Sequence, residues 1–401
     1  MKKALALWLC LVLWTAWAFP PVSAETADVT ETAEEGDWAA WAKKRFWVRN
    51  AINGVVIVTR NGEELFRYAY GTHGNGGKEP VSPDTLYRIA SVTKMVTAIG
   101  VMQLVERGAV ALDEDISAYL PFPVRNPAFP EVPVTLRQVL SHTSSLRGDV
   151  SDYAIDWANI TLKKDPCFRH DAAPGSRYEY ANLNGALLGA VIEAVTGQSL
   201  NTYMKENVFD VLGITAAYHP SLLGEGADTV DLFSPRGYIY LRASDVARER
   251  YTDRPDPAGN LGASVGGLYI SPASLSVLGN CLLGGGMAKN GRLLNEGTIR
   301  MMEKDQSLFT DSSVACFSPY GLGMERVTAS AGETWTGHQG RLSGFTADVY
   351  YQRETGLCVV VVCNGYGYRM EGSLVLLALQ WLNKATLEAG GVLPEESFEV
   401  E

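Results

Sequence analysis

The sequence predicts an α+β fold with an α/β lobe and an all-α lobe, in which strands from both ends of the chain share one antiparallel sheet flanked by helices. Three observations support this. Residues 55–70 read as a strand hairpin, and strand patterns return after residue 320. Residues 91–300 alternate helical patterns with glycine- and proline-containing loops, which indicates a helical insertion. The 401 residues, 46% hydrophobic and 20% charged, are typical of a globular chain with a large core.

The first elements are a helix and a hairpin. A short helix is expected near Trp38 to Val48. Val55–Thr59 and Glu64–Tyr70 flank Arg60–Glu63, whose Asn-Gly pair is typical of a two-residue hairpin turn. We therefore expect two antiparallel strands here.

A buried helix is expected after Ser91. Val92, Met95 and Ile99 repeat at helical spacing, and apolar residues occupy the other faces as well. Gly108 is expected just beyond the helix end with a positive φ, because glycine closes helices in this way.

The second half of the chain predicts another helix and then strands. An amphipathic helix is expected over Leu183–Thr196, closed by Gly197. We expect the active site where the two lobes meet. Strands are expected over Tyr320–Val327, Phe345–Gln352 and Leu357–Cys363, and a helix from about Gly372 to Glu388.

The ends of the chain read as segments outside the fold. Lys2-Lys3 and an apolar run from Ala4 to Phe19 fit a secretory signal cleaved after Ala24, with an uncleaved membrane anchor as the alternative. A cleaved signal predicts a secreted or extracytoplasmic protein at the cell envelope, with no membrane span left. The expected organisation is a signal peptide (1–24), an acidic disordered segment (25–36), one domain (37–390) with a helical lobe at about 91–300, and an acidic tail (391–401).

Charge and cysteine content exclude several classes of function. The net charge of −11 and the lack of a basic run disfavour nucleic-acid binding. Of the six cysteines, Cys10 lies in the apolar run, and the other five cannot all pair. Cys358 and Cys363 should point to opposite faces of one strand, so buried unpaired thiols are expected. The five histidines are scattered singly, so no metal and no cofactor is expected.

The first candidate site motif is Ser91-Val92-Thr93-Lys94. On a helix it puts a hydroxyl and an amine one turn apart on the same face, so Lys94 is placed to take the Ser91 proton. Lysine is rarely buried without a partner or a task. A catalytic site at the helix N-terminus is therefore favoured, because free backbone N–H groups there stabilise an oxyanion. The alternative is a chance motif on a surface helix.

The second candidate motif is Tyr180-Ala181-Asn182. On an extended segment the side chains of Tyr180 and Asn182 face the same way, so a phenol and a carboxamide would point into one cleft. A phenol beside an ammonium group can have its pKa lowered enough to carry a proton. The alternative is a packed tyrosine followed by an asparagine that caps the next helix.

The third candidate motif is His338-Gln339-Gly340-Arg341, which leads into a strand over Thr346–Tyr351. Glycine lets the backbone approach a ligand closely. His338 is a candidate proton donor or partner of a substrate carboxylate, and an N–H just beyond Gly340 would complete an oxyanion hole with that of Ser91. The alternative is a turn with an exposed histidine.

Together, the order Ser-x-x-Lys, Tyr-x-Asn, His-x-Gly resembles the penicillin-recognising serine hydrolases, in the branch of class C β-lactamases and D-alanyl-D-alanine carboxypeptidases. The resemblance covers nearly all of the chain after the signal, including Val139–Leu146, Gly189–Gly197 and Gly266–Tyr269. It implies a β-lactamase/transpeptidase-like fold.

The resemblance also implies a role for each motif residue. Ser91 would be the nucleophile, and Lys94 and Tyr180 would share proton transfer. Asn182 would orient the substrate, and His338 would lie on the strand that lines the cleft. The backbone amides of Ser91 and Arg341 would form the oxyanion hole.

Departures from the family pattern bear on the substrate. His338-Gln339-Gly340 stands where most β-lactamases of this superfamily carry Lys-Thr-Gly, and it is more similar to some D,D-peptidases and D-aminopeptidases. Arg341 stands where small residues are common, so its side chain would narrow the cleft or pair with a substrate carboxylate. Asn184-Gly185 also departs from the usual pattern. Asn182, His338, Gln339, Gly340 and Arg341 are the expected substrate-binding residues.

The expected function is a secreted serine hydrolase that forms an acyl-enzyme on D-Ala-D-Ala-type peptides or related amides. Its partner would be a small molecule or a peptidoglycan peptide. A β-lactamase or small-ester esterase and a non-catalytic penicillin-binding sensor are the alternatives. Gly262–Gly266 also matches the nucleophile elbow of α/β-hydrolases around Ser264, but it lacks the strand before it and the helix after it.

Overall fold

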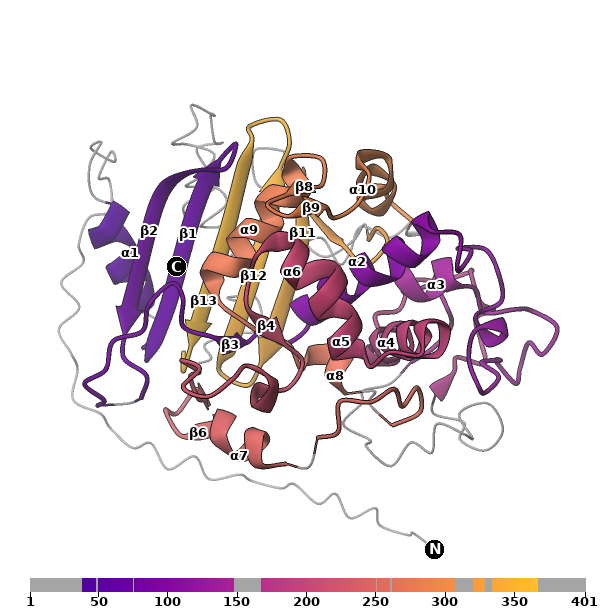
Figure 1. The fold of residues 1–401 in the computed structure, drawn as a ribbon, viewed down its shortest axis with the longest axis horizontal. Helices are drawn as coiled ribbons and strands as arrows, with labels where there is room; N and C mark the ends of the chain where they lie inside the picture. Colours follow the sequence, from indigo (N-terminus) through magenta and orange to yellow (C-terminus); the bar gives the residue numbers. More distant parts are fainter. Residues whose placement is uncertain are drawn as a thin grey trace, which may run out of the picture. The chain divides into compact units, whose positions relative to one another are not determined.

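The computed structural model describes residues 38–47, 50–74, 76–147, 167–249, 251–259, 262–306, 320–328 and 334–366 (Figure 1). The expected signal peptide, the two acidic segments, Cys316 and the expected helix at about 372–388 lie outside these residues. None of the helices within these ranges has the length and apolar character that a membrane span requires.

Strands from opposite ends of the described chain pair in one antiparallel sheet, as predicted. Its six strands are Asn53–Arg60 (β1), Glu63–Gly71 (β2), Glu325–Thr328 (β10), Thr334–Leu342 (β11), Phe345–Gln352 (β12) and Leu357–Asn364 (β13). They are ordered β10-β11-β12-β13-β1-β2. Val55 of β1 pairs with Val362 of β13, and β12 and β13 are buried along their whole length. Such continuous burial requires both faces of the sheet to be covered.

The hairpin between β1 and β2 turns at the predicted Asn-Gly pair. Asn61 and Gly62 have φ values of 51° and 85°. Two successive residues with positive φ are typical of a type I′ turn, whose twist matches that of the strands.

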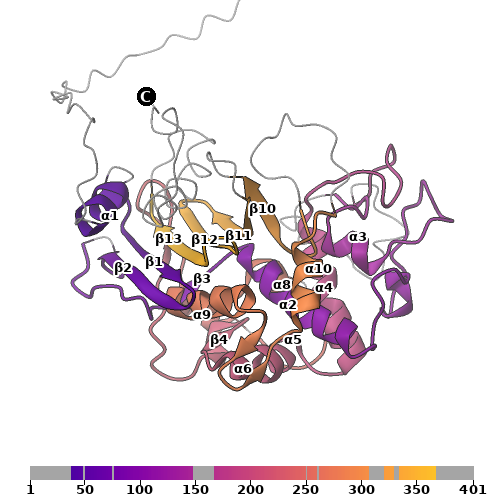
Figure 2. The ribbon, with the colours of Figure 1, turned by 90° about the horizontal axis from the view of Figure 1, so that it is seen from above.

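Helices cover both faces of the sheet (Figure 2). Helix α1 (Trp38–Trp47) lies on one side, and α2 (Val92–Glu106) and α9 (Pro272–Leu283) lie on the other. One apolar cluster forms between the sheet and α2, and a second forms between the sheet and α1. Successive side chains along a strand belong alternately to the two clusters. Cys358 packs in the cluster on the α2 side and Cys363 in the cluster on the α1 side, which confirms the prediction. The four cysteines of the described chain are all buried: Cys167, Cys281, Cys358 and Cys363.

Within the residues that the structure describes, the region between β2 and β10 contains many helices, as predicted, and its strands are only two or three residues long. Its helices are α2, α3 (Leu136–Leu140), α4 (Asn182–Thr196), α5 (Leu200–Met204), α6 (Asp210–Leu212), α7 (Ala243–Arg248), α8 (Ala263–Gly266), α9 and α10 (Glu296–Glu303), with shorter helical turns at Ile116–Ala118, Lys205–Phe209 and Pro220–Leu222. Its strands are β3 (Tyr87–Arg88), β4 (Ala216–Ala217), β5 (Leu232–Phe233), β6 (Ile239–Leu241), β7 (Tyr269–Ile270), β8 (Met287–Ala288) and β9 (Gly291–Arg292).

The two long helices of this region end at the predicted glycines. Gly108 after α2 and Gly197 after α4 have φ values of 69° and 67°. Helix α2 is buried from Val92 to Leu104, so it passes through the protein interior. The motif at its first turn therefore does not lie on a surface helix.

The late strands differ from the prediction at their start. The expected strand Tyr320–Val327 begins only at Glu325, and Tyr320 makes an isolated bridge to that residue. A turn separates them, because Gly323 has a φ of 72° and the Gly321 N–H bonds to the Met324 carbonyl. Thr334–Leu342 is strand β11, so His338 lies on a strand, as the family resemblance implied.

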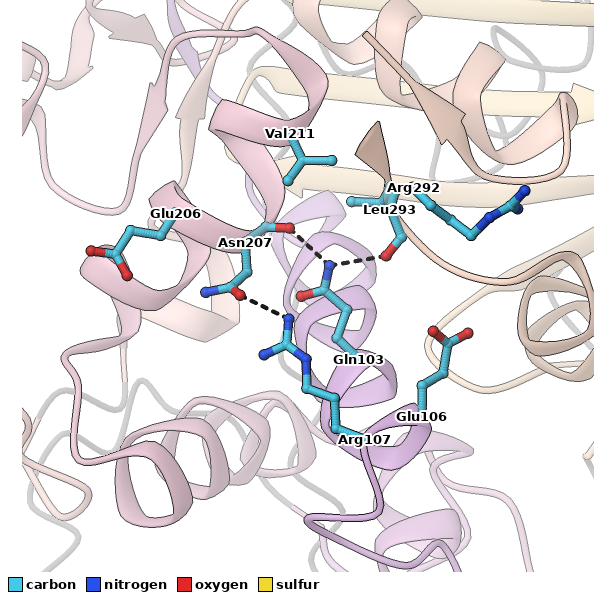
Figure 3. A pocket seen from close by; sticks show the side chains of 8 residues that line it. All are labelled: Gln103, Glu106, Arg107, Glu206, Asn207, Val211, Arg292 and Leu293. Carbon is cyan, nitrogen blue, oxygen red and sulfur yellow. Dashed lines mark hydrogen bonds between the residues drawn. The ribbon is translucent and has the colours of Figure 1, made fainter. Parts of the chain in front are cut away.

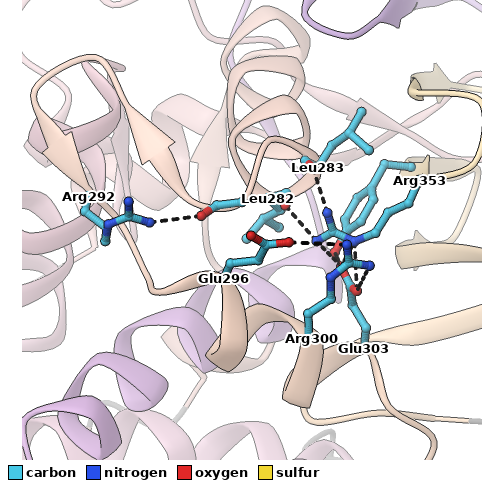
Figure 4. A network of polar contacts seen from close by, with 9 residues as sticks. Leu282, Leu283, Arg292, Glu296, Arg300, Glu303 and Arg353 are labelled. Atoms are coloured by element: carbon cyan, nitrogen blue, oxygen red, sulfur yellow. Dashed lines mark hydrogen bonds and ion pairs between the residues drawn. The ribbon is translucent and has the colours of Figure 1, made fainter.

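Hydrogen bonds from Arg353 connect the β12–β13 turn to the ends of two helices (Figure 4). Its guanidinium donates to the carbonyls of Leu282 and Leu283 at the end of α9, at 3.0 and 2.7 Å. It also donates to both carboxylate oxygens of Glu303 at the end of α10. A bidentate, partly buried pair of this kind fixes geometry as well as adding stability.

Candidate active site

Ser91 lies at the N-terminal end of α2, where the chain turns sharply. It is the N-cap residue, and the preceding Ala90 has a φ of 49°, which is costly for a residue that carries a Cβ. The first N–H groups of a helix have no acceptor within that helix, and the positive end of the helix dipole lies there. Ser91 is partly exposed, so its hydroxyl can be reached from solvent.

Lys94 meets Ser91 inside the protein. Its side chain is 1% exposed, and its Nζ donates to Ser91 Oγ at 2.8 Å and to the Val265 carbonyl at 2.9 Å. The two polar residues of the Ser-x-x-Lys motif are thus in direct amine–hydroxyl contact. A lysine so placed can accept the hydroxyl proton when the serine attacks a carbonyl.

Gly185 makes room for the Lys94 side chain. A Cβ at Gly185 would lie 2.9 Å from both Cγ and Cε of Lys94 and 3.0 Å from its Cδ. Any larger residue would push the lysine stem away from Ser91. This departure from the usual family residues therefore has a local physical reason.

Tyr180 and Asn182 flank the start of α4 beside this pair. Ala181, and not Asn182, is the N-cap of α4, and its extended dihedrals (φ −135°, ψ 131°) place the side chains of Tyr180 and Asn182 on the same side. Lys94 Nζ lies 5.2 Å from the centroid of the Tyr180 ring. Tyr180 is 37% exposed, so Lys94 lies next to a tyrosine that solvent can reach.

Two residues to which the sequence assigned no role, His142 and Tyr320, complete this cluster. The His142 ring stacks on Tyr180 at 4.3 Å between centroids and meets Tyr320 edge-on at 4.9 Å. Burial, then the nearby Tyr180 and Glu325, raises the pKa of Tyr320 well above its usual value, so it stays protonated. His142 lies within the family-like segment 139–146, but its contact with Tyr180 depends on the tertiary fold.

His338 lies beneath the cluster on β11 and is fully buried, so the alternative of an exposed histidine in a turn is wrong. Its Nδ1 lies 2.6 Å from the Gln339 carbonyl, which can only accept, so Nδ1 carries the proton. Its Nε2 then accepts from the Tyr320 hydroxyl at 3.0 Å. Burial lowers the pKa of His338; the nearby Glu325 partly offsets this and the Lys94 charge adds to it, so the ring stays neutral.

Gly340 brings the β11 backbone close to that of Ser91. A Cβ at this position would lie 2.1 Å from the Ile89 carbonyl oxygen and 3.1 Å from the Ser91 nitrogen. Only glycine permits this approach of two backbones. The backbone beside Gly340 therefore adjoins the N–H of Ser91.

The N–H of Arg341 points to the open edge of β11. The Gln339 N–H donates to Glu325, away from β12, at 3.2 Å. Because N–H directions alternate along a strand, the Arg341 N–H points the same way. This is the orientation that an oxyanion donor would need beside Ser91.

The side chains of Gln339 and Arg341 lie on the other face of the sheet from His338 and Gly340, because faces alternate along a strand. Arg341 accordingly influences Asp348. Burial raises the pKa of Asp348 to about 7, and the positive charge of Arg341 partly offsets this rise. Only the backbone of Arg341 therefore faces Ser91.

Two other places in the molecule were candidates for a site. Ser264 of the competing Gly-x-Ser-x-Gly motif is fully buried, and a Cβ at Gly189 of α4 would lie 2.6 Å from its Oγ. A cavity of about 240 Å³ lies at the far end of α2 (Figure 3), where Gln103 donates to the carbonyls of Asn207 and Leu293 at 2.8 and 3.0 Å.

Comparison with known proteins agrees with the fold. The sequence matches the β-lactamase family model over residues 36–378. Esterase EstB from Burkholderia gladioli is 36% identical over 184 residues, covering 41% of this chain and 46% of the esterase. Penicillin-binding protein 4* from Bacillus subtilis (strain 168) is 27% identical over 214 residues, covering 51% of this chain and 44% of that protein. The matches thus span less than half of either relative.

Solved structures share the fold. The octameric penicillin-binding protein homologue from Pyrococcus abyssi superimposes with a TM-score of 0.68 at 23% identity, over 89% of this chain and 78% of that one. The β-lactamase/D-alanine carboxypeptidase from Pseudomonas syringae gives a TM-score of 0.65 at 19% identity, over 86% and 97%. Since the family match covers most of the sequence, the chain belongs to the β-lactamase family of serine hydrolases.

Proposed function

We propose that this protein hydrolyses D-Ala-D-Ala-type peptides or related amides through an acyl-enzyme on Ser91. The observation that carries the proposal is the contact between the buried Lys94 Nζ and Ser91 Oγ at 2.8 Å, at the N-terminus of α2. The contact pairs a nucleophile with a base where backbone N–H groups favour negative charge.

In the first step Lys94 acts as the neutral amine: Ser91 Oγ attacks the substrate carbonyl, and the Lys94 amine takes the hydroxyl proton. The tetrahedral intermediate would be stabilised by the N–H groups of Ser91 and Arg341. When the C–N bond breaks, Tyr180 passes a proton to the leaving amine and is reprotonated from Lys94. In the second step water attacks the ester carbon and restores Ser91, so the product is a carboxylic acid. Asn182 would orient the substrate beside Tyr180.

The names of two similar proteins support this substrate class. One relative is a penicillin-binding protein, and one structural neighbour is described as a D-alanine carboxypeptidase. Cleavage of an amide also needs a proton donor for the departing nitrogen, which Tyr180 would supply.

A neutral ester is a second candidate substrate, and the state of His338 favours it. A peptide ending in D-Ala-D-Ala carries a carboxylate, whereas the His338 ring is buried and has both nitrogens engaged. The Arg341 side chain lies on the opposite sheet face from His338. An alkanol leaving group needs neither side chain as a charge partner, and esterase EstB is one of the relatives.

A substrate panel tests the proposal. The peptide, its C-terminal amide, a β-lactam and a small ester would be compared on the wild type and on Ser91→Ala. Release of D-alanine by the wild type alone supports the peptidase, whereas ester turnover without D-alanine release supports the second candidate. Retention of full activity in Ser91→Ala would refute the acyl-enzyme. A Ser91 adduct that forms but does not turn over would identify a penicillin-binding sensor.

Location is part of the proposal. Lys2-Lys3 and the apolar run that follows support export to the cell envelope, where peptidoglycan peptides occur. N-terminal sequencing of the protein purified from its natural host would test this, because processing predicts a mature chain that starts after Ala24.

A further inference from the structure

His142 is held in an unusual conformation directly behind Tyr180. It follows α3, is 3% exposed and has a φ of 56°. A non-glycine residue in this region is strained and persists only where its surroundings require it. Its carbonyl accepts from the Glu179 N–H at 2.8 Å, so the histidine contacts the Tyr180 segment through both backbone and side chain.

The hydrogen bonds of the ring fix its protonation state. His142 Nδ1 accepts from the Ala181 N–H at 3.1 Å, and the side-chain amide of Asn184 lies 3.0 Å from the same atom. A backbone N–H can only donate, so Nδ1 must be without a proton.

Asn184 is oriented as a second donor to that atom. Ser144 Oγ accepts from the Leu146 N–H at 3.2 Å, which leaves its own hydrogen for Asn184 Oδ1 at 2.6 Å. The nitrogen of the Asn184 amide then faces His142. With two donors on Nδ1, the neutral tautomer with its proton on Nε2 is the one that fits.

The bonded N–H belongs to the residue between the two side chains of the Tyr-x-Asn motif. An acceptor at Ala181 therefore fixes the backbone from which both Tyr180 and Asn182 project. We propose that His142, kept in the Nε2–H tautomer by Asn184, is a positioning residue that sets Tyr180 for proton transfer. The proposal rests on the proposed function of Ser91, Lys94 and Tyr180.

The surroundings of His142 oppose its protonation. Burial, then the charge of Lys94 and the presence of His338, holds the pKa of His142 well below its usual range. A proton on Nδ1 would face the Ala181 N–H and would add a second cation near Lys94. The titratable groups that face the ring are Lys94 on α2, Tyr178 and Tyr180 before α4, Tyr320, and His338 on β11.

The first test reads the tautomer without using activity. In ¹⁵N NMR of the full chain, the histidine whose signals vanish in His142→Asn should show a bare Nδ1 and a protonated Nε2, unchanged down to about pH 5.5. A protonated Nδ1 at neutral pH would overturn the proposal, whatever the enzyme activity.

The second test distinguishes loss of the hydrogen-bond acceptor at His142 from loss of side-chain volume. His142→Asn keeps an acceptor near Nδ1 and tolerates the positive φ, whereas His142→Leu has a similar size and no acceptor. We expect His142→Leu to acylate Ser91 with an amide substrate, whose leaving group needs a proton, about 10²-fold more slowly than His142→Asn, because misplacement by about 1 Å can cost that much. Comparison of melting temperatures identifies any general loss of fold.

A double-mutant comparison distinguishes positioning of Tyr180 from a merely structural role. In a Tyr180→Phe background the difference in acylation rate between His142→Asn and His142→Leu should disappear, because no phenol remains to be positioned. An equal difference in both backgrounds would overturn the proposal. If no substrate acylated Ser91, the proposed function would fail, and the NMR result would still decide the tautomer.

Discussion

Substitution of Gly185 by alanine tests whether the position of Lys94 controls acylation. The new Cβ would lie 2.9 Å from Cγ and Cε of Lys94. Carbon atoms prefer a separation of about 3.5–4.0 Å, so the lysine stem must move by roughly 0.6–1 Å. Its Nζ is held 2.8 Å from Ser91 Oγ, and this movement would disturb that contact.

The expected loss of activity exceeds what destabilisation explains. A displacement of about 1 Å lowers the acylation rate by about 10²-fold. Overpacking of a core costs about 1–3 kcal/mol, partly offset by the roughly 1 kcal/mol that alanine gains over glycine in a helix. The protein should therefore remain folded, with a melting temperature lowered by a few degrees.

Gly279→Ala in α9 is the matched control. A Cβ there would lie 2.5 Å from Cys358 Sγ, so it crowds the core similarly without reaching Lys94. Acylation of Ser91 by a chromogenic ester would be followed in single-turnover experiments for both variants, with melting temperatures measured in parallel. A Gly185→Ala protein that acylates as fast as Gly279→Ala would refute the reasoning.

Three further predictions concern other groups. Tyr180→Phe should slow acylation by an amide about 10²–10⁴-fold and acylation by an activated ester much less, because a good leaving group needs no proton; equal losses in rate assays would exclude this role. The stability of the wild type should fall as pH rises from about 4 to 7, by at most about 1.4 kcal/mol per pH unit, since the folded state binds the Asp348 proton more tightly; denaturation of Asp348→Asn should lack this slope. Burial raises the pKa of Cys281 to about 11 and that of Cys358 to about 12, so mass spectrometry should find both unalkylated by iodoacetamide in the native protein, and rapid labelling would contradict their burial.

The sequence correctly predicted the ends of those elements that are followed by a typical turn residue. Asn61-Gly62, Gly108 and Gly197 all have the positive φ that the sequence suggested, and each ends its element where expected. These features depend on neighbouring residues only, which is why a single sequence reveals them.

Strand β11 was not predictable in the same way. Thr334–Leu342 contains two glycines and several polar residues, which lowers its intrinsic preference for a strand. It becomes a strand because it pairs with β12 from Thr336 to Leu342, so its structure comes from the tertiary fold.

The candidate site shows the same difference between local contacts, which the sequence predicts, and tertiary contacts, which it does not. The contact between Ser91 and Lys94 spans three residues and follows from helical spacing. By contrast, His142 reaches Ala181 across 39 residues of sequence, and Tyr320 reaches His338 across 18. No local pattern gives such contacts, so the sequence indicated the pairing of Ser91 with Lys94 but not the residues that contact the Tyr180 segment.

The most direct test of the central claim is the site of covalent labelling. Treatment with a fluorophosphonate or a labelled penicillin, followed by intact-mass measurement and peptide mapping, should show one adduct on Ser91 that is absent from Ser91→Ala. Undiminished labelling of Ser91→Ala, or no labelling of the wild type at a concentration that labels a control serine hydrolase, would contradict the assignment of Ser91 as the nucleophile.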